Sequence, residues 1–251
     1  MLREANIIRT VDRISAYIQR CVTVIAAERR EEVVELFDSM NLLFPHWGIM
    51  SCPAMHPEIQ YISKNMGSIL GHTQEYISLN RTVDKTIRFV HEDDKDDVHQ
   101  CMVYMQEFLE TVPPDEHQNY RCVLHYRFQK ADGQYIYLHD EKATLNLRGE
   151  GNLYYCLFHN QDNEQLFAGV KLEIFHQQNT LYKLREHRPA ATRNPLSKRE
   201  RELVTLIKRG LSTKEIAWHL NISHNTVRNI KSKLFEKYNV NNSIELLNMA
   251  G

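Results

Sequence analysis

The last 57 residues, 195–251, carry closely spaced helix boundaries, and these constrain the fold more than any other feature of the chain. A serine followed three residues later by a glutamate opens a helix, because each side chain can bond a backbone N–H group that has no partner in the first turn. This pair occurs at Ser197 and Glu200 and again at Ser212 and Glu215. Between them, Gly210 suits the left-handed end of the first helix. The spacing predicts short, separate helices.

Two further helices complete this segment. Ser223 follows a break in the apolar pattern and can cap a longer helix that runs to Tyr238. Asn242 with Glu245 opens a fourth helix in the same way. A short helix, a tight turn and a longer helix form a helix-turn-helix. We therefore predict an all-α domain of four helices over residues 196–251.

The longer helix of this domain has two unlike sides. At 100° per residue, one side is an apolar stripe of Val227, Ile230, Leu234 and Tyr238. The opposite side carries amide, hydroxyl and cationic groups on Asn225, Arg228, Asn229, Ser232 and Lys233. Arginine can pair with guanine and asparagine with adenine, while serine and lysine contact phosphates or bases. The outer side is therefore suited to the major groove of DNA.

The segment also follows a long motif, S-x-R-E-R-E and then G-L-S-x-K-E-I-A-x-x-L-x-I-S-x-x-T-V-R. It resembles the LuxR/GerE-type helix-turn-helix of bacterial transcriptional regulators. The resemblance implies base contacts by Arg228, Asn229 and Ser232, and backbone contacts by Thr226 and Lys231. The complete candidate DNA-binding set is Lys214, Asn225, Thr226, Arg228, Asn229, Lys231, Ser232 and Lys233. The chain departs from the family at Ile230, at residues 238–239 and at Ser243, where the family usually has His, Leu-Gly and Arg.

Charge is distributed unevenly along the chain. Residues 189–251 contain 11 Lys and Arg against 5 Asp and Glu, whereas residues 1–188 contain 20 against 27. A basic module attracts phosphates, and an acidic body is suited to sensing or assembly. The alternative is a helical bundle that docks proteins and whose basic residues are only a solvated face.

Residues 55–160 are typical of a mixed α/β unit. Alternating side chains predict strands at 120–129, 135–147 and 153–159, with a D-G turn before the second. This order, after G-H-T-Q-E-Y-I and F-V-H-E-D-D, resembles the PAS sensor fold. The resemblance implies a five-stranded antiparallel sheet with small helices that enclose a ligand or a dimer surface, and a first strand near 60–63. The expected fold class is α+β: this PAS-like sheet with flanking helices, plus the four-helix C-terminal domain.

Two helical segments are expected around the sensor, at 1–45 and 162–187, with a polar linker at 188–195. Each has an apolar stripe at heptad spacing. The first comprises Ile7, Val11, Ile14, Ile18, Cys21 and Ile25. The second comprises Leu166, Val170, Ile174, Leu181 and Leu184, with Gln177 as a single polar break. Each stripe could pack on its own domain, but two of them beside a module whose family binds paired half-sites favour a homodimer.

Other sites were weighed against these predictions. Quorum-sensing LuxR members have a similar length and an acyl-lactone pocket with a tryptophan, but the context of Trp47 does not match it. His91 or His99 could hold haem, and the acidic residues 92–97 could hold Mg²⁺ or a phosphoryl group, although a helix N-terminus explains them equally. Further candidates are His125, His139 and His159 for a metal, and Cys101, Cys122 and Cys156 for redox chemistry. Ordinary core or surface roles are the favoured interpretation.

Composition supports a cytoplasmic protein. The chain has 42% hydrophobic residues, no run of 18 apolar residues and no N-terminal secretion signal. Its five cysteines lack C-x-x-C spacing, which argues against a zinc ribbon. We expect a transcriptional regulator, not an enzyme, that binds double-stranded DNA and is controlled by its sensor through the 162–187 helix. No cofactor is expected, a small-molecule ligand and RNA polymerase are candidate partners, and the alternative is a ligand- or cofactor-binding sensor whose C-terminal bundle docks proteins.

Overall fold

The computed structural model describes residues 27–52, 59–80, 83–147, 151–161, 169–177, 180–189, 196–238 and 240–250, with isolated positions before residue 27. The chain divides into two compact units: most of the residues up to His187 form the first, and the residues from Arg188 onward belong to the second. In the described parts of the chain, no helix is both long and apolar enough to cross a membrane.

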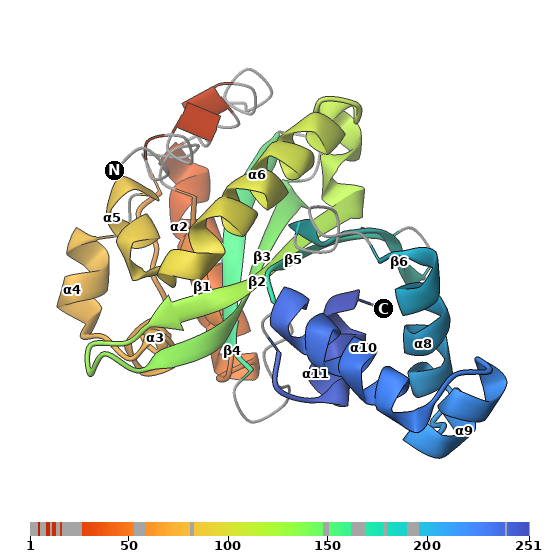
Figure 1. Cartoon of the computed structure of the whole chain (residues 1–251). Helices are drawn as coiled ribbons and strands as arrows, with labels where there is room; N and C mark the ends of the chain where they lie inside the picture. Colours follow the sequence, from red (N-terminus) through yellow and green to blue (C-terminus); the bar gives the residue numbers. More distant parts are fainter. Residues whose placement is uncertain are drawn as a thin grey trace. The chain divides into compact units, whose positions relative to one another are not determined.

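The first unit is built on one antiparallel sheet of six strands in the order β1-β4-β3-β2-β5-β6 (Figure 1). Its strands are β1 (Gly48–Ser51), β2 (Tyr120–Gln129), β3 (Tyr135–Asn146), β4 (Asn152–Asn160), β5 (Lys171–Gln177) and β6 (Leu181–His187). The three strands predicted between residues 120 and 159 are therefore confirmed. Side chains alternate between the two faces of a strand, so both faces of this sheet need a cover.

One face of the sheet is covered mainly by α6 (Lys95–Leu109), which crosses it in Figure 1. Val98, Cys101 and Phe108 of α6 pack with strand residues such as Leu124 and Leu138 in the larger core. Shorter elements precede and follow α6: α3 (Met66–Leu70), α4 (Gln74–Leu79), α5 (Val83–Thr86), η1 (Ile87–Phe89), η2 (Glu92–Asp94) and η3 (Pro114–Asn119). The expected α+β class is confirmed by this arrangement.

The opposite face is covered in part by α2 (Ala27–Leu43). Val33 and Phe37 of this helix pack on Ile49, Leu153 and Tyr155 in a second core. The same clusters thus assign even-numbered residues of β3 and β4 to the α6 side and odd-numbered ones to the α2 side. Two separate cores on one sheet explain why both parities of these strands are apolar.

The prediction of a helix at 162–187 is wrong. The described part of this segment forms β5 and β6, an antiparallel hairpin that extends the sheet beside β2. Val170 and Ile174 are buried on the sheet, whereas Leu181 and Leu184 are exposed. β-Branched and aromatic residues at 174–176 and pairing with β2 outweigh the heptad spacing, because propensity yields to tertiary contacts. The expected five-stranded sheet therefore has a sixth strand.

The first strand also differs from the prediction. It is β1, which pairs with β4, while the segment near 60–63 contributes only a bridge between Ile62 and Met50. The N-terminal stripe from Ile7 to Ile25 lies outside the described residues, and so do residues 190–195 of the expected linker. Of the segment predicted as helical at 1–45, the structure describes a helix over Ala27–Leu43.

The acidic residues 92–97 have a structural role beyond that of a helix N-terminus. Asp94 is buried, and its carboxylate accepts hydrogen bonds from the backbone N–H and the guanidinium of Arg127, with the shortest at 2.5 Å. Asp96 and Asp97 lie in the first turn of α6, where acidic groups suit the helix dipole. Asp94 therefore connects η2 to β2.

Over its described residues from 196 onward, the second unit contains four helices, as predicted. They are α8 (Lys198–Lys208), α9 (Thr213–His219), α10 (His224–Tyr238) and α11 (Ser243–Ala250). Both predicted capping boxes are present, at Ser197 with Glu200 and at Ser212 with Glu215. Asn242 accepts the backbone N–H of Glu245 at the start of α11. Local helix signals thus place the starts of these helices.

Candidate DNA-binding surface

The buried side of α10 anchors this helix in the core of the second unit. Val227 and Leu234 have no exposed surface, and Tyr238 is nearly as deeply buried. They pack with Leu203 of α8 and Ile216 of α9. Because one stripe of α10 is fixed in the core, its opposite side must face outward.

The outward side of α10 carries the candidate residues. Asn225, Thr226, Arg228, Asn229, Ser232 and Lys233 are exposed, and so is Lys214 on α9. Lys231 is half-buried, with its Nζ 5.9 Å from the centre of the Phe235 ring. Thr226 also takes part in the helix cap, since its N–H donates to Ser223 Oγ over 3.0 Å. Seven of the eight candidates are thus free of the core.

The turn before α10 is a tight left-handed stop. Asn221 has φ 51°, and it is the sole non-glycine residue with positive φ among those described. The N–H of Ile222 donates to the carbonyl of Ala217 over 3.0 Å, which closes the end of α9. Asparagine tolerates this conformation better than most residues. The turn is reinforced from α8, because the guanidinium of Arg199 donates to the carbonyl oxygen of Leu220.

Glu200 has a second bond that sequence reasoning did not predict. Its Oε2 accepts the N–H of Ser197 over 2.7 Å and lies 2.9 Å from Nζ of Lys237 near the end of α10. Burial alone would raise the pKa of this carboxyl, but the bonds to Ser197 and Lys237 outweigh it and hold the pKa below its ordinary value. Only the folded packing of α8 on α10 brings residues 37 positions apart into contact.

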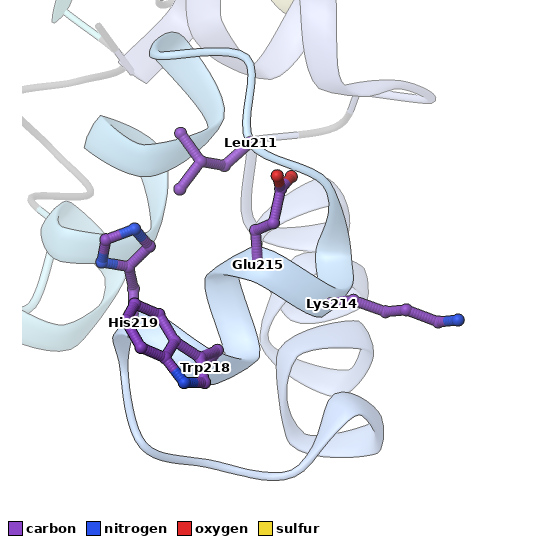
Figure 2. A pocket seen from close by; sticks show the side chains of 5 residues that line it. All are labelled: Leu211, Lys214, Glu215, Trp218 and His219. Atoms are coloured by element: carbon purple, nitrogen blue, oxygen red, sulfur yellow. The ribbon is translucent and has the colours of Figure 1, made fainter.

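A hollow of about 440 Å³ lies beside α9, lined by Leu211, Lys214, Glu215, Trp218 and His219. Figure 2 shows the indole of Trp218 next to His219, with Lys214 directed away from the other side chains. Trp218 is 80% exposed, which is unusual for the largest apolar side chain. Its outward position on the helix was the available sequence signal, and it was missed.

The sheet unit holds a partly buried polar cluster that sequence reasoning also missed. Lys142 forms an ion pair with Asp140, and the hydroxyl of Tyr126 donates to the same carboxylate over 3.1 Å. Lys142 faces Cys122 and Cys156 in the strand register. Burial lowers the pKa of Lys142, but Asp140 outweighs this effect and raises it above its ordinary value. The alternation of Asp140 and Lys142 on one strand face was the signal that could have found the pair.

The histidines weighed as ligands have other partners. His91 Nδ1 accepts the N–H of Asp93, and His99 Nε2 lies 3.0 Å from Thr10 Oγ1. His125 lies 3.1 Å from both Gln161 and Glu173, and burial lowers its pKa. Trp47 packs against two more, with ring centres 5.0 Å from His139 and 5.0 Å from His159. Among the residues that the structure describes, no group of three or more His, Cys, Asp or Glu could hold a metal ion.

Whole-chain structural comparisons give low similarity. The Vibrio cholerae VqmA dimer, a LuxR-type receptor, aligns with 18% identity and a TM-score of 0.30, over 87% of this chain and 86% of that chain. VqmA bound to DPO aligns with 17% identity and a TM-score of 0.28, over 86% and 88%.

Sequence comparisons with curated relatives match short stretches of this chain. The DesR transcriptional regulatory protein of Bacillus subtilis is 48% identical over 54 residues, which cover 22% of this chain and 27% of DesR. UhpA of Salmonella typhimurium is 40% identical over 57 residues, which cover 23% and 29%. The chain thus spans about a quarter of the length of the curated relatives it matches. Residues 194–250 match the family model described as bacterial regulatory proteins, luxR family. The C-terminal unit of this chain is therefore a helix-turn-helix domain of the luxR family.

Proposed function

We propose that this protein is a transcriptional regulator that reads DNA in the major groove through the outer side of α10. The observation that carries the proposal is the exposure of Asn225, Arg228, Asn229 and Ser232 on one side of a helix whose other side is buried. These side chains can bond base edges. The excess of Lys and Arg in residues 189–251 supplies attraction to phosphates.

The sheet unit acts as the sensor in this proposal. Lys142, Asp140 and Tyr126 support that role, because burying the Asp140 carboxylate of this ion pair beside an apolar core costs desolvation and often marks a functional site. A small molecule with polar groups is the expected ligand. Since β5 and β6 replace the predicted connecting helix, β6 is the element that leads from the sensor to the DNA-binding unit. The effect on DNA would be a shift between populations of domain arrangements.

The remaining parts of the proposal concern assembly and location. A homodimer fits a helix-turn-helix domain that binds paired half-sites. RNA polymerase is the partner through which a DNA-bound regulator would act, and the cytoplasm is where it would meet both. The protein would work by binding and not by catalysis.

The test is selection of genomic DNA fragments by the purified full chain, followed by binding measurements on the recovered site. Arg228→Ala should weaken binding to that site by about 1–3 kcal/mol, the value of one good base contact, and leave a scrambled duplex almost unaffected. Lys231→Ala should weaken binding to both duplexes similarly. It should also reduce the salt slope, which is the slope of log affinity against log salt concentration, by about 0.9, as expected for one phosphate contact.

Two results would contradict the proposal. If Arg228→Ala left both affinities unchanged, α10 would not read bases in the manner described. If the wild-type chain retained DNA without sequence preference, the alternative of a sensor whose helical bundle docks proteins would be supported, and the exposed Trp218 would be the first surface to examine.

A further inference from the structure

We infer that Arg199 and Glu200, two successive residues of α8, act as positioning residues that set the placement of α10 and thereby the sequence selectivity of the domain. The inference rests on the proposed function of α10 as the DNA-reading helix. It goes further because neither residue belongs to the outer side of α10, and each acts at a different end of that helix.

Arg199 holds the N-terminal end through the turn. Its Nη2 donates to the carbonyl oxygen of Leu220, and its Nη1 donates to Oε2 of Glu202 over 2.9 Å. Leu220 is the C-cap of α9 and directly precedes the left-handed Asn221. A guanidinium can bond two acceptors in a fixed plane. Arg199 therefore fixes the turn from which α10 starts.

Glu200 holds the C-terminal end. Its Oε2 lies 2.9 Å from Nζ of Lys237, and the backbone N–H of Ser197 donates to the same oxygen over 2.7 Å. The capping box thus holds the Glu200 carboxylate in the orientation in which it pairs with Lys237. Both side chains are mostly buried, with 20% of Glu200 and 26% of Lys237 exposed, so solvent screens this pair less than a surface pair. The bond ties the last turn of α10 to the first turn of α8.

Because α10 is long, a small rotation about one of its ends displaces the other end by a larger distance. Its 15 residues span about 21 Å at 1.5 Å per residue. If the C-terminal tie were lost, a pivot of roughly 5° about the turn that Arg199 holds would move the last turn by about 2 Å and Ser232, about 12 Å along the helix, by about 1 Å. Base contacts need placement within about 0.5 Å. Phosphate contacts tolerate more, because a flexible lysine acts as a point charge. Loss of the tie should therefore reduce selectivity more than general affinity.

The chain offers a closely matched control for this effect. Glu215 forms the second capping box, in which Ser212 N donates to its Oε2 over 2.7 Å, as Ser197 N does to Glu200. Glu200→Gln and Glu215→Gln therefore remove the same charge from the same local motif. Glu200→Gln additionally breaks the ion pair with Lys237 on α10. A difference between the two variants reports the tie and not the cap or the net charge.

The experiment measures the affinity of the full-length variants for the site selected by the wild-type chain and for a scrambled duplex of equal length. For Glu200→Gln, affinity for the selected site should fall roughly five- to twentyfold, in the lower range for loss of one base contact, with less than about a twofold change on the scrambled duplex. Glu215→Gln should keep the wild-type ratio of the affinity for the selected site to the affinity for the scrambled duplex. Partial unfolding cannot imitate this result, because an unfolded fraction lowers both affinities equally.

Further variants test the geometry. Lys237→Met should lower the ratio like Glu200→Gln, and the double variant should lower it no further, because both changes break one bond. Arg199→Lys keeps the charge but loses the fork, so it should lower the ratio while the salt slope stays unchanged. If Arg199 or Lys237 instead bound a phosphate, Arg199→Met or Lys237→Met would reduce that slope by about 0.9 and leave the ratio intact.

The outcomes separate this inference from the proposed function. If the wild-type chain selects a site but Glu200→Gln and Glu215→Gln have equal ratios, the positioning role is wrong and DNA reading by α10 stands. If the wild-type chain selects no site at all, both the proposed function and the inference are overturned.

Discussion

The bond between Asp94 and Arg127 leads to a sharp prediction for the stability of the sheet unit. The carboxylate of Asp94 accepts three hydrogen bonds from Arg127: from the backbone N–H over 3.0 Å, from Nε over 3.1 Å and from Nη2 over 2.5 Å. The side chain of Asp94 is 5% exposed and that of Arg127 is 25% exposed. Replacing Asp94 by alanine leaves a backbone donor and a mostly buried guanidinium without this acceptor.

The expected cost follows from these contacts. Removing one partner of a buried ion pair costs about 3–5 kcal/mol, and the partial exposure of Arg127 lets water recover some of it. We therefore expect Asp94→Ala to lower the free energy of unfolding by about 3 kcal/mol. Asp94→Asn should cost about 2 kcal/mol, because an amide oxygen can still accept the backbone N–H. For a unit of this size, about 3 kcal/mol corresponds to a decrease in Tm of roughly 6–12 °C.

The assay is urea and thermal unfolding of the full chain, followed by far-UV circular dichroism. Asp93→Asn is the matched control, since its carboxylate is 68% exposed and lies 3.9 Å from the guanidinium of Arg127. It should change stability by less than about 0.5 kcal/mol. A cost of Asp94→Ala below about 1 kcal/mol, or equal to that of Asp93→Asn, would refute the reasoning from burial.

Three other predictions concern separate features. Leu234→Ala should cost about 2–5 kcal/mol and unfold most of the small second unit, which limited trypsin digestion would detect while the sheet unit stays intact. The pKa of Glu200 is lowered on folding, so its stabilising contribution is present above the ordinary value of 4.5 and is lost as the pH falls below it; Glu200→Gln should flatten the decline of Tm in this range. Burial raises the pKa of Cys122 and Cys156 to about 12, so alkylation at pH 8, followed by mass spectrometry, should be on the order of 10³-fold slower than in urea.

The second unit could be derived from sequence almost completely. Its boundaries depend on Ser197, Ser212, Ser223 and Asn242, whose side chains act on backbone groups within three residues. Such contacts form regardless of the rest of the fold. The outward side of α10 follows from helical periodicity in the same way. Whether those side chains contact DNA stays a prediction.

The sheet unit shows where this reasoning fails. The strands at β2, β3 and β4 alternate clearly and are joined by short turns, so they were predicted. The segment that forms β5 and β6 has heptad spacing, and only pairing of β5 with β2 makes it a strand. Periodicity over two heptads cannot report a partner strand more than 40 residues earlier in the chain. The same limit applies to β1, which pairs with β4.

The amino-acid sequence by itself determined the helix-turn-helix, its caps and the side of α10 that faces outward, because these depend on neighbours a few residues away. Tertiary structure alone decided the sixth strand, the bonds between Asp94 and Arg127, and the bonds by which Arg199 and Glu200 hold α10. The physical reason is the separation along the chain of the residues that interact. Ion pairs and strand pairing between distant residues exist only after the chain has brought them together, and no local pattern specifies which partner each group will meet.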